Sequence, residues 1–293
     1  MNWRDIELSI STSTKRDFNV LQSRSVGGGS INTAYVLEGE SDSYFVKVNG
    51  KHYAEMFVAE AEGLAELVKA AVIRVPKPIS RGVSSKHAFI VMENINLSRG
   101  GQSSAAKLGE ALANLHQTHS LEYGWHRDNT IGSTPQINKE HNNWVEFYRE
   151  HRLLYQIELA VNNGCGRELK NLGDKLCDNL ELFFDSYQLK PSLLHGDLWS
   201  GNYGYDGDGN PVIFDPAVYF GDREADIAMT ELFGGFSMSF YDAYNDASPL
   251  DDGYRVRKIL YNLYHVLNHY NLFGGGYQQQ AVGMMKDLLS EVG

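Results

Sequence analysis

The chain has 293 residues, of which 42% are hydrophobic and 22% charged, and its formal net charge is −11 at pH 7. This composition is that of a globular protein large enough to bury a core without disulfides or a structural metal. The acidic balance argues against nucleic-acid binding driven by counterion release, so we expect no nucleic-acid partner.

No apolar run approaches the roughly 20 residues that span a bilayer. The first ten residues, MNWRDIELSI, contain acidic side chains and no continuous apolar core. We therefore expect neither membrane insertion nor a secretory signal. Cys165 and Cys177 do not form a metal-type Cys-x-x-Cys pair. Without an export signal they are predicted to be reduced thiols in a cytoplasmic protein.

Residues 1–18 are predicted to form a helix and a polar link, followed by candidate strands at about 19–26 and 33–37. A glycine-rich turn lies between the two strands and consists of Gly27, Gly28, Gly29 and Ser30. Successive glycines let the backbone approach a phosphate closely and present N–H groups to it. Taken alone, a triple glycine is more often an ordinary flexible turn.

Residues 44–48 alternate like a strand and place Lys47 among apolar neighbours. Lys47 is either an exposed strand lysine or a lysine that contacts the α- and β-phosphates of a nucleotide. The second role requires a carboxylate partner. Residues 54–70 are predicted to form a helix, and Glu60 lies near its apolar face. Glu60 is therefore the predicted partner of Lys47.

Two prolines in residues 75–78 end this helical region, because proline removes a donor and fixes φ. An apolar strand at residues 88–92 then runs into the polar segment Glu93-Asn94-Ile95-Asn96. The pattern resembles the hinge between two kinase lobes, where backbone groups around Glu93 and Ile95 could hydrogen-bond an adenine edge. An ordinary exit from a strand into a loop gives the same pattern.

The rest of the chain is predicted to be mainly helical, with helices at about 103–118, 143–161, 169–184, 222–228, 255–273 and 277–292. Residues 120–142 are predicted to form a long irregular loop. His116 and His119 lie three positions apart at a helix end without acidic ligands, which favours a structural role over a metal site. The glycine run at 274–276 is predicted to terminate a helix.

The stretch from residue 193 to residue 215 carries the strongest chemical signal. It contains His195-Gly196-Asp197, then Asn202 five positions after Asp197, then a polar turn and an apolar run that ends on Asp215. Asp-x-x-x-x-Asn followed by a hairpin and a second Asp is the arrangement that holds magnesium beside the terminal phosphates of a nucleotide. The oxygens of Asn202 and Asp215 suit Mg²⁺.

Phosphoryl transfer needs positioning and charge neutralisation more than covalent chemistry from the protein. In this interpretation Asp197 accepts or orients the proton of the attacking hydroxyl, and His195 shapes the loop. Asp226 is expected to point back and accept N–H bonds from that loop. The alternative is a loop whose Asp, Asn and Gly residues only form turns. The order and separation of the elements favour a small-molecule kinase that uses ATP and Mg²⁺.

Several longer segments share a pattern with known sequences. They are GGGSIN at 27–32, FVKV at 45–48, MFVAEAEGL at 56–64, HGDLWSGN at 195–202, IFDPA at 213–217, GDREADIAMTELFGGF at 221–236 and LNHYNLFGGGY at 267–277. Together they resemble the fructosamine-3-kinase (ketosamine-3-kinase) family, in the aminoglycoside-phosphotransferase-like branch of the protein-kinase fold. HGD-x-x-x-x-N alone indicates only a phosphotransferase of this fold. Trp199 within it, with DPA and GDRE after it, is more specific.

The resemblance implies an enzyme that uses ATP and Mg²⁺ to phosphorylate the 3-hydroxyl of ketoamines such as fructosamine and ribulosamine, free or protein-bound, and so promotes deglycation. It implies Asp197 as the catalytic base, Asn202 and Asp215 as metal ligands, and Lys47 paired with Glu60.

Trp199 would lie at the sugar pocket, where an aromatic face can stack on a sugar ring. The alternative is that Trp199 is a packed loop residue. Because Asp215 is followed by Pro-Ala and not by the Phe-Gly of protein kinases, we expect no flipping activation segment.

We therefore predict an α+β, two-lobed protein-kinase-like fold. Residues 1–94 would form a small nucleotide-binding lobe with an antiparallel sheet plus a helix, and residues 95–293 a larger, mainly helical lobe with the catalytic loop and substrate site. The alternatives are a kinase of the same fold for an aminoglycoside, choline or another amino alcohol, and a non-catalytic nucleotide-binding regulator. Such a regulator usually lacks the Lys, Asp or Asn that are present here. The chain is expected to be a monomer or a weak homodimer.

Overall fold

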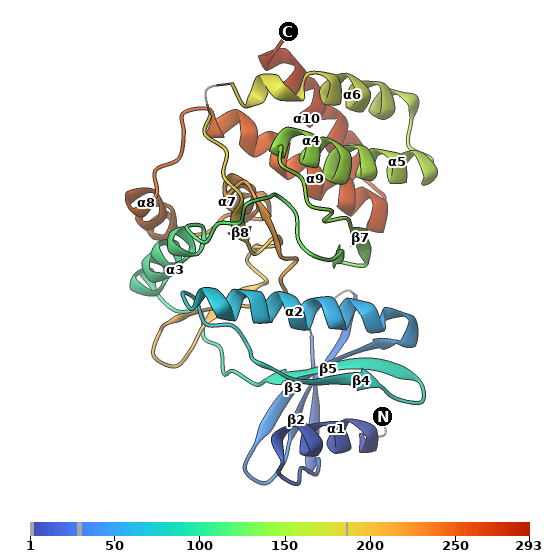
Figure 1. The fold of residues 1–293 in the computed structure, drawn as a ribbon, viewed down its shortest axis with the longest axis vertical. Helices are drawn as coiled ribbons and strands as arrows, with labels where there is room; N and C mark the ends of the chain where they lie inside the picture. The colour runs from blue at the N-terminus through green and yellow to red at the C-terminus, as the bar shows by residue number, and fades with distance from the viewer. Residues whose placement is uncertain (1–2, 28–30, 186) are drawn as a thin grey trace. The chain divides into compact units, whose positions relative to one another are not determined.

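Figure 1 shows the computed structural model of the chain, which describes residues 3–27, 31–185 and 187–293. The chain forms two compact units. The first comprises Met1–Ser104 and Gly201–Pro216, and the second comprises Ala105–Ser200 and Ala217–Gly293. The hinge pattern predicted a boundary after residue 94 and a continuous second lobe. The structure instead groups residues 201–216 with the first unit, because that segment is a hairpin bonded to it.

The described residues of the first unit form a five-stranded antiparallel sheet in the order β1-β2-β3-β5-β4, two helices and a short hairpin. The elements are α1 (Arg4–Thr14), β1 (Gln22–Val26), β2 (Thr33–Glu38), β3 (Ser43–Gly50), a 3₁₀ turn (Lys51–Tyr53), α2 (Ala54–Ala70), β4 (Pro78–Val83), β5 (His87–Glu93), β9 (Tyr203–Tyr205) and β10 (Pro211–Ile213).

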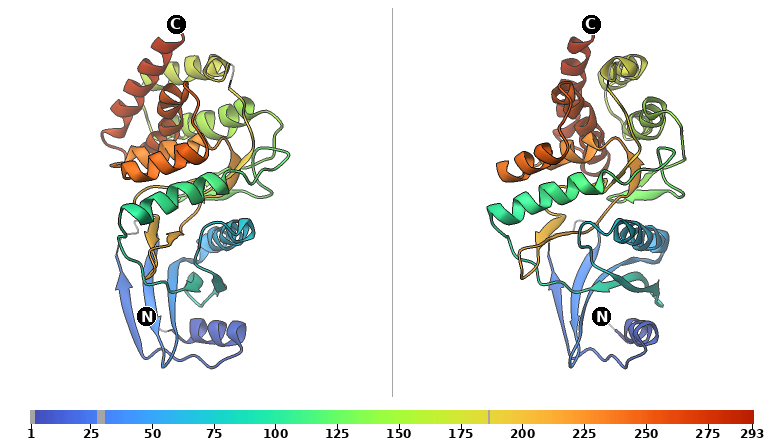
Figure 2. Two further views of the ribbon diagram at one scale, coloured as in Figure 1. Left: turned by 90° about the vertical axis from the view of Figure 1, so that its left-hand side faces the viewer. Right: turned by 60° about the vertical axis from the view of Figure 1, so that its left-hand side comes forward.

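The central strand β3 sends alternate side chains to the two faces of this sheet, as the strand period of two requires. Val46 and Val48 belong to a buried cluster with Ile6 and Ile10 of α1. Lys47, between the two valines, therefore points to the other face. The ribbon views place α1 and α2 on opposite faces of the sheet (Figures 1 and 2). The Val-Lys-Val pattern thus aims one buried lysine at α2.

Helix α2 covers residues 54–70, as the sequence predicts, and buries the apolar face that includes Met56, Phe57, Leu64 and Leu67. It ends at Ala71, whose φ of 55° is left-handed. A left-handed residue after the last turn is a common way to terminate a helix.

The hairpin of β9 and β10 is fixed to the first unit by main-chain hydrogen bonds. Ser98 N–H donates to the carbonyl of Tyr205 (2.7 Å), and Ile213 N–H donates to the carbonyl of Arg74 (3.0 Å). In the connecting turn, Oδ1 of Asp206 accepts N–H bonds from residues 208 and 210 (3.0 and 2.9 Å). An aspartate that bonds the following backbone in this way stabilises a tight turn, which explains the predicted hairpin.

The second unit is mainly helical, as predicted. Its elements are α3 (Gln102–Leu115, with its first turn in the first unit), β6 (Asn129–Ile131), β7 (Thr134–Gln136), α4 (Trp144–Tyr148), a π-helical segment (Arg149–Leu154), α5 (Tyr155–Asn162), α6 (Arg167–Asp178), a 3₁₀ turn (Leu180–Phe183), β8 (Ser192–Leu194), β11 (Tyr219–Gly221), α7 (Glu224–Leu232), α8 (Met238–Ala247), α9 (Tyr254–Phe273) and α10 (Tyr277–Glu291). Helices α9 and α10 pack against each other (Figure 2), and Gly274 ends α9 with a φ of 67°.

Several elements differ from the sequence prediction. The region predicted as an irregular loop contains the hairpin of β6 and β7. Strands β4 and β11 and helix α8 were not predicted, and the helix predicted at 143–161 is interrupted by the π-helical segment. The strands of the hairpin are three residues long and polar, so they carry no periodic pattern, and their pairing depends on contacts with distant parts of the chain.

No helix in the part of the chain that the structure describes is long and apolar enough to cross a membrane. Cys165 and Cys177 are both free thiols.

Candidate active site

Lys47 in the first unit is bonded to two carboxylates. Its Nζ lies 2.6 Å from Oε1 of Glu60 on α2 and 2.5 Å from Oδ1 of Asp215, which follows β10. The side chains of Lys47 and Glu60 are 7% and 10% exposed, whereas that of Asp215 is 42% exposed. The structure therefore brings Lys47 together with its predicted partner Glu60 and with Asp215, which the sequence analysis selected separately. Their roles toward a nucleotide stay predictions.

Burial and the neighbouring charges together shift the pKa values of Lys47 and Glu60. Burial disfavours the charged form of Lys47, but Asp215 and Glu60 outweigh it and raise the pKa of the ammonium above its ordinary value. Burial also raises the pKa of Glu60; Lys47 opposes this rise and Asp215 adds to it. The arrangement thus holds a fixed positive charge next to a partly exposed carboxylate.

The hairpin places Asn202 and Asp215 at the same end of β9 and β10. Tyr203 pairs with Ile213, and Phe214 N–H donates to the carbonyl of Asn202 (3.0 Å). Asp215 then adopts a left-handed φ of 59°. Such a backbone costs energy for a residue other than glycine and is concentrated at functional sites.

The donor set of Asn202 and Asp215 fits Mg²⁺ bound together with phosphates. Mg²⁺ takes one or two protein oxygens and completes its shell with phosphate and water. Lys47 contacts one oxygen of the Asp215 carboxylate, and a carboxylate has two. Among the described residues no group of three or more His, Cys, Asp or Glu side chains could hold a metal ion alone.

The other residues predicted to contact the nucleotide are only partly described. Gly28, Gly29 and Ser30 lie outside the described residues, and Gly27 is exposed at the end of β1. At the predicted hinge, Glu93 N–H already donates to the carbonyl of Lys77 (2.9 Å). Of the two predicted hinge positions, Ile95 is therefore the better candidate for an adenine contact through its N–H.

In the second unit, the loop that holds Asp197 is fixed by Asp226 of α7. Oδ2 of Asp226 accepts the N–H of His195 (2.7 Å) and Oδ1 accepts the N–H of Gly196 (2.8 Å). This is the contact that the sequence analysis expected. Ala217 N–H donates to the carbonyl of His195 (2.9 Å). The loop is therefore held by side-chain and main-chain bonds on both sides.

Gly196 allows this close packing. Its φ is +82°, and a Cβ atom would lie 2.1 Å from the carbonyl oxygen of Ala217. Both the backbone angle and the space require glycine.

His195 shapes the loop, as predicted. Its side chain is buried, and Nδ1 accepts the N–H of Asp197 (3.3 Å). A fully enclosed imidazole is poorly placed to take a proton from a substrate. Asp197, by contrast, is partly exposed, as a group that meets a substrate must be.

A buried histidine that the sequence analysis treated only as structural supports Asp226. Nε2 of His116 lies 3.2 Å from Oδ2 of Asp226, and Nδ1 lies 2.8 Å from the hydroxyl of Tyr244. Burial opposes ionisation of Asp226, but hydrogen bonds and charge from His116, with His195 and the Gly196 N–H, lower its pKa below the ordinary value. Asp226 is thus kept as a carboxylate that accepts from the loop.

Trp199 is half-buried and lies edge-on to Phe233, with ring centroids 6.4 Å apart and an interplanar angle of 78°. Phe233 in turn lies 4.8 Å from the ring of His269. Trp199 therefore belongs to a row of rings and keeps part of its surface exposed, which is compatible with a sugar contact.

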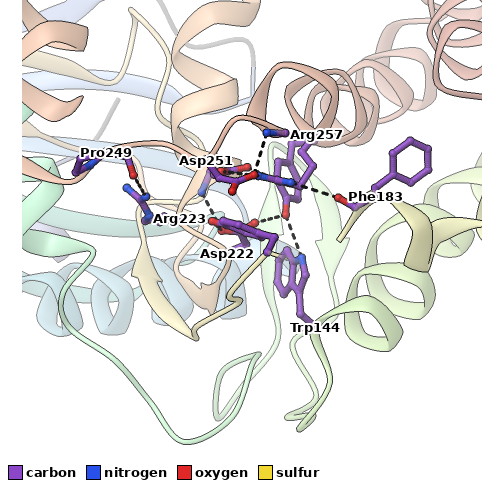
Figure 3. Close-up of polar contacts among 11 residues, drawn as sticks. Trp144, Phe183, Asp222, Arg223, Pro249, Asp251 and Arg257 are labelled. Atoms are coloured by element: carbon purple, nitrogen blue, oxygen red, sulfur yellow. Dashed lines mark hydrogen bonds and ion pairs between the residues drawn. The ribbon is translucent and has the colours of Figure 1, made fainter. Parts of the chain in front are cut away.

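The GDRE motif anchors the start of α7 to helix α9 and to the segment that follows α8 (Figure 3). Arg257 binds both oxygens of Glu224 (2.7 and 3.0 Å). Asp222 accepts from the hydroxyl of Tyr261, and Arg223 donates to the carbonyl of Ser248 (2.8 Å). The motif is therefore structural and holds the helix that carries Asp226.

Two buried carboxylates of this motif, Glu224 and Asp222, lie within electrostatic reach of Arg257, which bonds Glu224 and Asp251. Burial is the largest influence on Glu224; Arg257 opposes it, Asp222 adds to it, and the pKa of Glu224 rises to about 7. Burial and the nearby Asp222 therefore outweigh the opposing charges of Arg257 and Arg223.

Comparison with solved structures identifies the fold. The aminoglycoside phosphotransferase APH(4)-Ia, solved in a ternary complex with ADP and hygromycin B, superposes with a TM-score of 0.64 at 14% identity, over 98% of each chain. The crystal structure of a protein from Haemophilus somnus assigned to the fructosamine-3-kinases superposes with a TM-score of 0.90 at 31% identity, over 98% of this chain and 97% of that one. The α+β, protein-kinase-like fold and the lysine–glutamate–aspartate cluster define a phosphotransferase of the small-molecule kinase class.

The family model described as fructosamine kinase matches residues 2–291, and the chain belongs to this family. A probable ketoamine kinase from Synechocystis sp. is 47% identical over 290 residues, which cover 98% of this chain and 97% of the relative. The chloroplastic protein-ribulosamine 3-kinase of Arabidopsis thaliana is 44% identical over 268 residues, which cover 90% and 82%. The chain is therefore a kinase whose relatives are named for ketoamine substrates.

Proposed function

We propose that this kinase transfers the γ-phosphate of ATP to the 3-hydroxyl of a ketosamine, such as a fructosamine or a ribulosamine, and so promotes deglycation. The observation that carries the proposal is the position of Lys47, which bonds both Glu60 and Asp215. In kinases a lysine–glutamate pair fixes the nucleotide phosphates and a nearby aspartate holds the metal. The substrate class comes from the named activities of the relatives.

In this proposal each site residue has a separate role. Lys47 and the glycine-rich turn bind the phosphates, and Asn202 and Asp215 hold Mg²⁺, which would neutralise charge on them. Asp197 accepts the proton of the attacking hydroxyl. Trp199 offers an aromatic face to the sugar.

Activity with a panel of acceptors tests the proposal. ADP release would be measured in a coupled assay with ATP and Mg²⁺ and with ribulosyl-lysine, fructosyl-lysine, an aminoglycoside or choline as acceptor. We expect turnover with one or both glycated lysines, no turnover after Mg²⁺ is chelated, and recovery when Mg²⁺ is restored. Turnover confined to the aminoglycoside or choline would assign another substrate class. Nucleotide binding without turnover on any acceptor would favour the non-catalytic alternative.

Phosphate position is the second readout. NMR of the product should show the phosphorus coupled to the proton on C3 of the sugar, and coupling at another carbon would contradict the 3-hydroxyl assignment. The expected monomer or weak homodimer and the cytoplasmic location stay predictions.

A further inference from the structure

Residues 129–138 of the second unit carry three buried side-chain amides, Asn129, Gln136 and Asn138, which we call the amide clamp. We propose that the amide clamp positions the loop that holds Asp197 and that Gln136 is a positioning residue for phosphoryl transfer. The inference rests on the proposed function, because it assumes that Asp197 meets the substrate.

The amide clamp binds the main chain at Ala217, the last residue of the Asp-Pro-Ala motif, and at Val218 directly after it. Nδ2 of Asn129 donates to the carbonyl of Val218 (2.8 Å). Nε2 of Gln136 donates to the carbonyl of Ala217 (3.1 Å) and to Oδ1 of Asn129 (2.8 Å). Two consecutive carbonyls of the segment are therefore held by two side chains of one hairpin.

The chemistry of the partners fixes the orientation of each amide. A main-chain carbonyl only accepts, so Asn129 and Gln136 must turn their NH₂ groups toward Val218 and Ala217. The hydroxyl of Tyr264 then donates to Oε1 of Gln136 (2.8 Å). The two amides consequently have one arrangement that satisfies every bond.

A buried arginine fixes the third amide. The guanidinium of Arg152 donates to Oδ1 of Asn138 (2.8 Å) and to the carbonyl of Ile137 (2.6 Å), and its carbon lies 4.2 Å from the ring centroid of Tyr219. Because a guanidinium only donates, Asn138 must present its oxygen to Arg152 and its NH₂ to Asn129 (2.9 Å). Arg152 thus fixes the orientation of Asn138, which in turn bonds Asn129.

Ala217 connects the clamp to the loop of Asp197. Its carbonyl is held by Gln136, and its N–H donates to the carbonyl of His195 (2.9 Å). The same carbonyl oxygen lies where a Cβ atom of residue 196 would collide, at 2.1 Å. A shift of Ala217 must therefore displace His195 and Gly196, the two residues directly before Asp197.

Burying an amide costs free energy unless the amide is hydrogen-bonded. Apolar side chains could fill the same space without this cost. What the amides add is directional bonds to two main-chain carbonyls. The rate of catalysis falls steeply when a catalytic loop shifts, because a misplacement of about 1 Å can lower that rate about 100-fold. The clamp is suited to prevent such a shift.

Gln136→Met tests the inference, because methionine has a similar length and no amide. Tyr148→Phe is the matched control: Tyr148 is equally buried, and its hydroxyl donates to the main-chain carbonyl of Leu260 on α9 (3.0 Å). We expect Gln136→Met to lower kcat with ribulosyl-lysine about 10- to 100-fold and to leave the KM for ATP unchanged. Tyr148→Phe also removes a buried bond to a carbonyl, and it should lose stability and keep its kcat.

Hydrogen exchange distinguishes a local effect on the loop from a general loss of stability. In Gln136→Met, exchange in the segment 193–219 should speed up more than in Tyr148→Phe when both are compared at equal distance from their unfolding midpoints. Asn129→Ser, which removes the donor to Val218, replaces Gln136→Met if the latter does not fold, with the same expectation. A kcat equal to that of Tyr148→Phe would overturn the inference. A wild-type chain with no activity on any glycated lysine would instead refute the proposed function.

Discussion

Lys47 and Asp215 are 168 positions apart in the chain, and the ammonium of one lies 2.5 Å from the carboxylate of the other. Glu60 binds the same ammonium at 2.6 Å. One buried cation thus joins the sheet, helix α2 and the hairpin of β9 and β10. Lys47 is therefore expected to contribute both to stability and to phosphate binding. The two contributions can be tested independently.

Lys47→Met should destabilise the protein and remove activity. It leaves the Glu60 carboxylate buried without its cation, and breaking a buried ion pair in this way costs about 3–5 kcal/mol. In the double variant Lys47→Met/Glu60→Gln the buried charge is gone as well, so most of this stability should return while activity stays lost. Urea unfolding and the ADP-release assay give the two values. Recovery of activity in the double variant would show that Lys47 does not act on the nucleotide.

Glu224 should make the protein more stable as the pH falls from about 7 toward 5. Its pKa rises from 4.5 to about 7 in the folded state. Between these values the native state therefore binds a proton that the unfolded state does not. Stability then decreases as the pH rises through this window. The shift corresponds to at most about 3 kcal/mol.

Glu224→Gln supplies the comparison for this pH dependence. The free energy of unfolding would be measured in urea at pH 5.5 and pH 7.5 for both proteins. The wild type should gain stability at the lower pH relative to the variant, because only the wild type takes up this proton. Parallel pH dependence in the two proteins would mean that Arg257 keeps Glu224 ionised throughout.

The elements that sequence reasoning identified well are those whose pattern is local. Helix α2 has an apolar face at helical spacing and is followed by prolines, and the hairpin before Asp215 has a turn built by Asp206. The same reasoning selected Glu60 from the four glutamates of α2, because its spacing from Met56 and Phe57 places it near the apolar face of the helix. That spacing can be read from the sequence alone.

What could not be predicted depends on distant contacts. Asn129 and Gln136 sit in three-residue strands without apolar alternation, and their partners are carbonyls 89 and 81 positions away. His116 was recognised as structural, but its partner Asp226 lies 110 positions away. A single sequence contains no signal that joins such pairs, since each polar residue alone is equally typical of a solvated loop.

Trp199→Ala should raise the KM for the glycated substrate and leave the KM for ATP unchanged. Loss of an aromatic stacking contact worth about 0.5–1.5 kcal/mol corresponds to roughly a 2- to 13-fold change. Trp199→Phe keeps a ring next to Phe233 and should retain most of the affinity. If Trp199 only packs the loop, the alanine variant would instead lower stability and kcat without a selective change in the KM for the sugar.

The most direct test of the account is the rate of phosphate transfer to ribulosyl-lysine by Asp197→Asn, measured together with its affinity for ATP. The substitution keeps the size of the side chain and removes the proton acceptor. General base catalysis contributes about 10²- to 10⁴-fold, so the account predicts a fall in kcat of that order with unchanged ATP binding. A kcat close to that of the wild type would contradict the assignment of Asp197 to the transfer step.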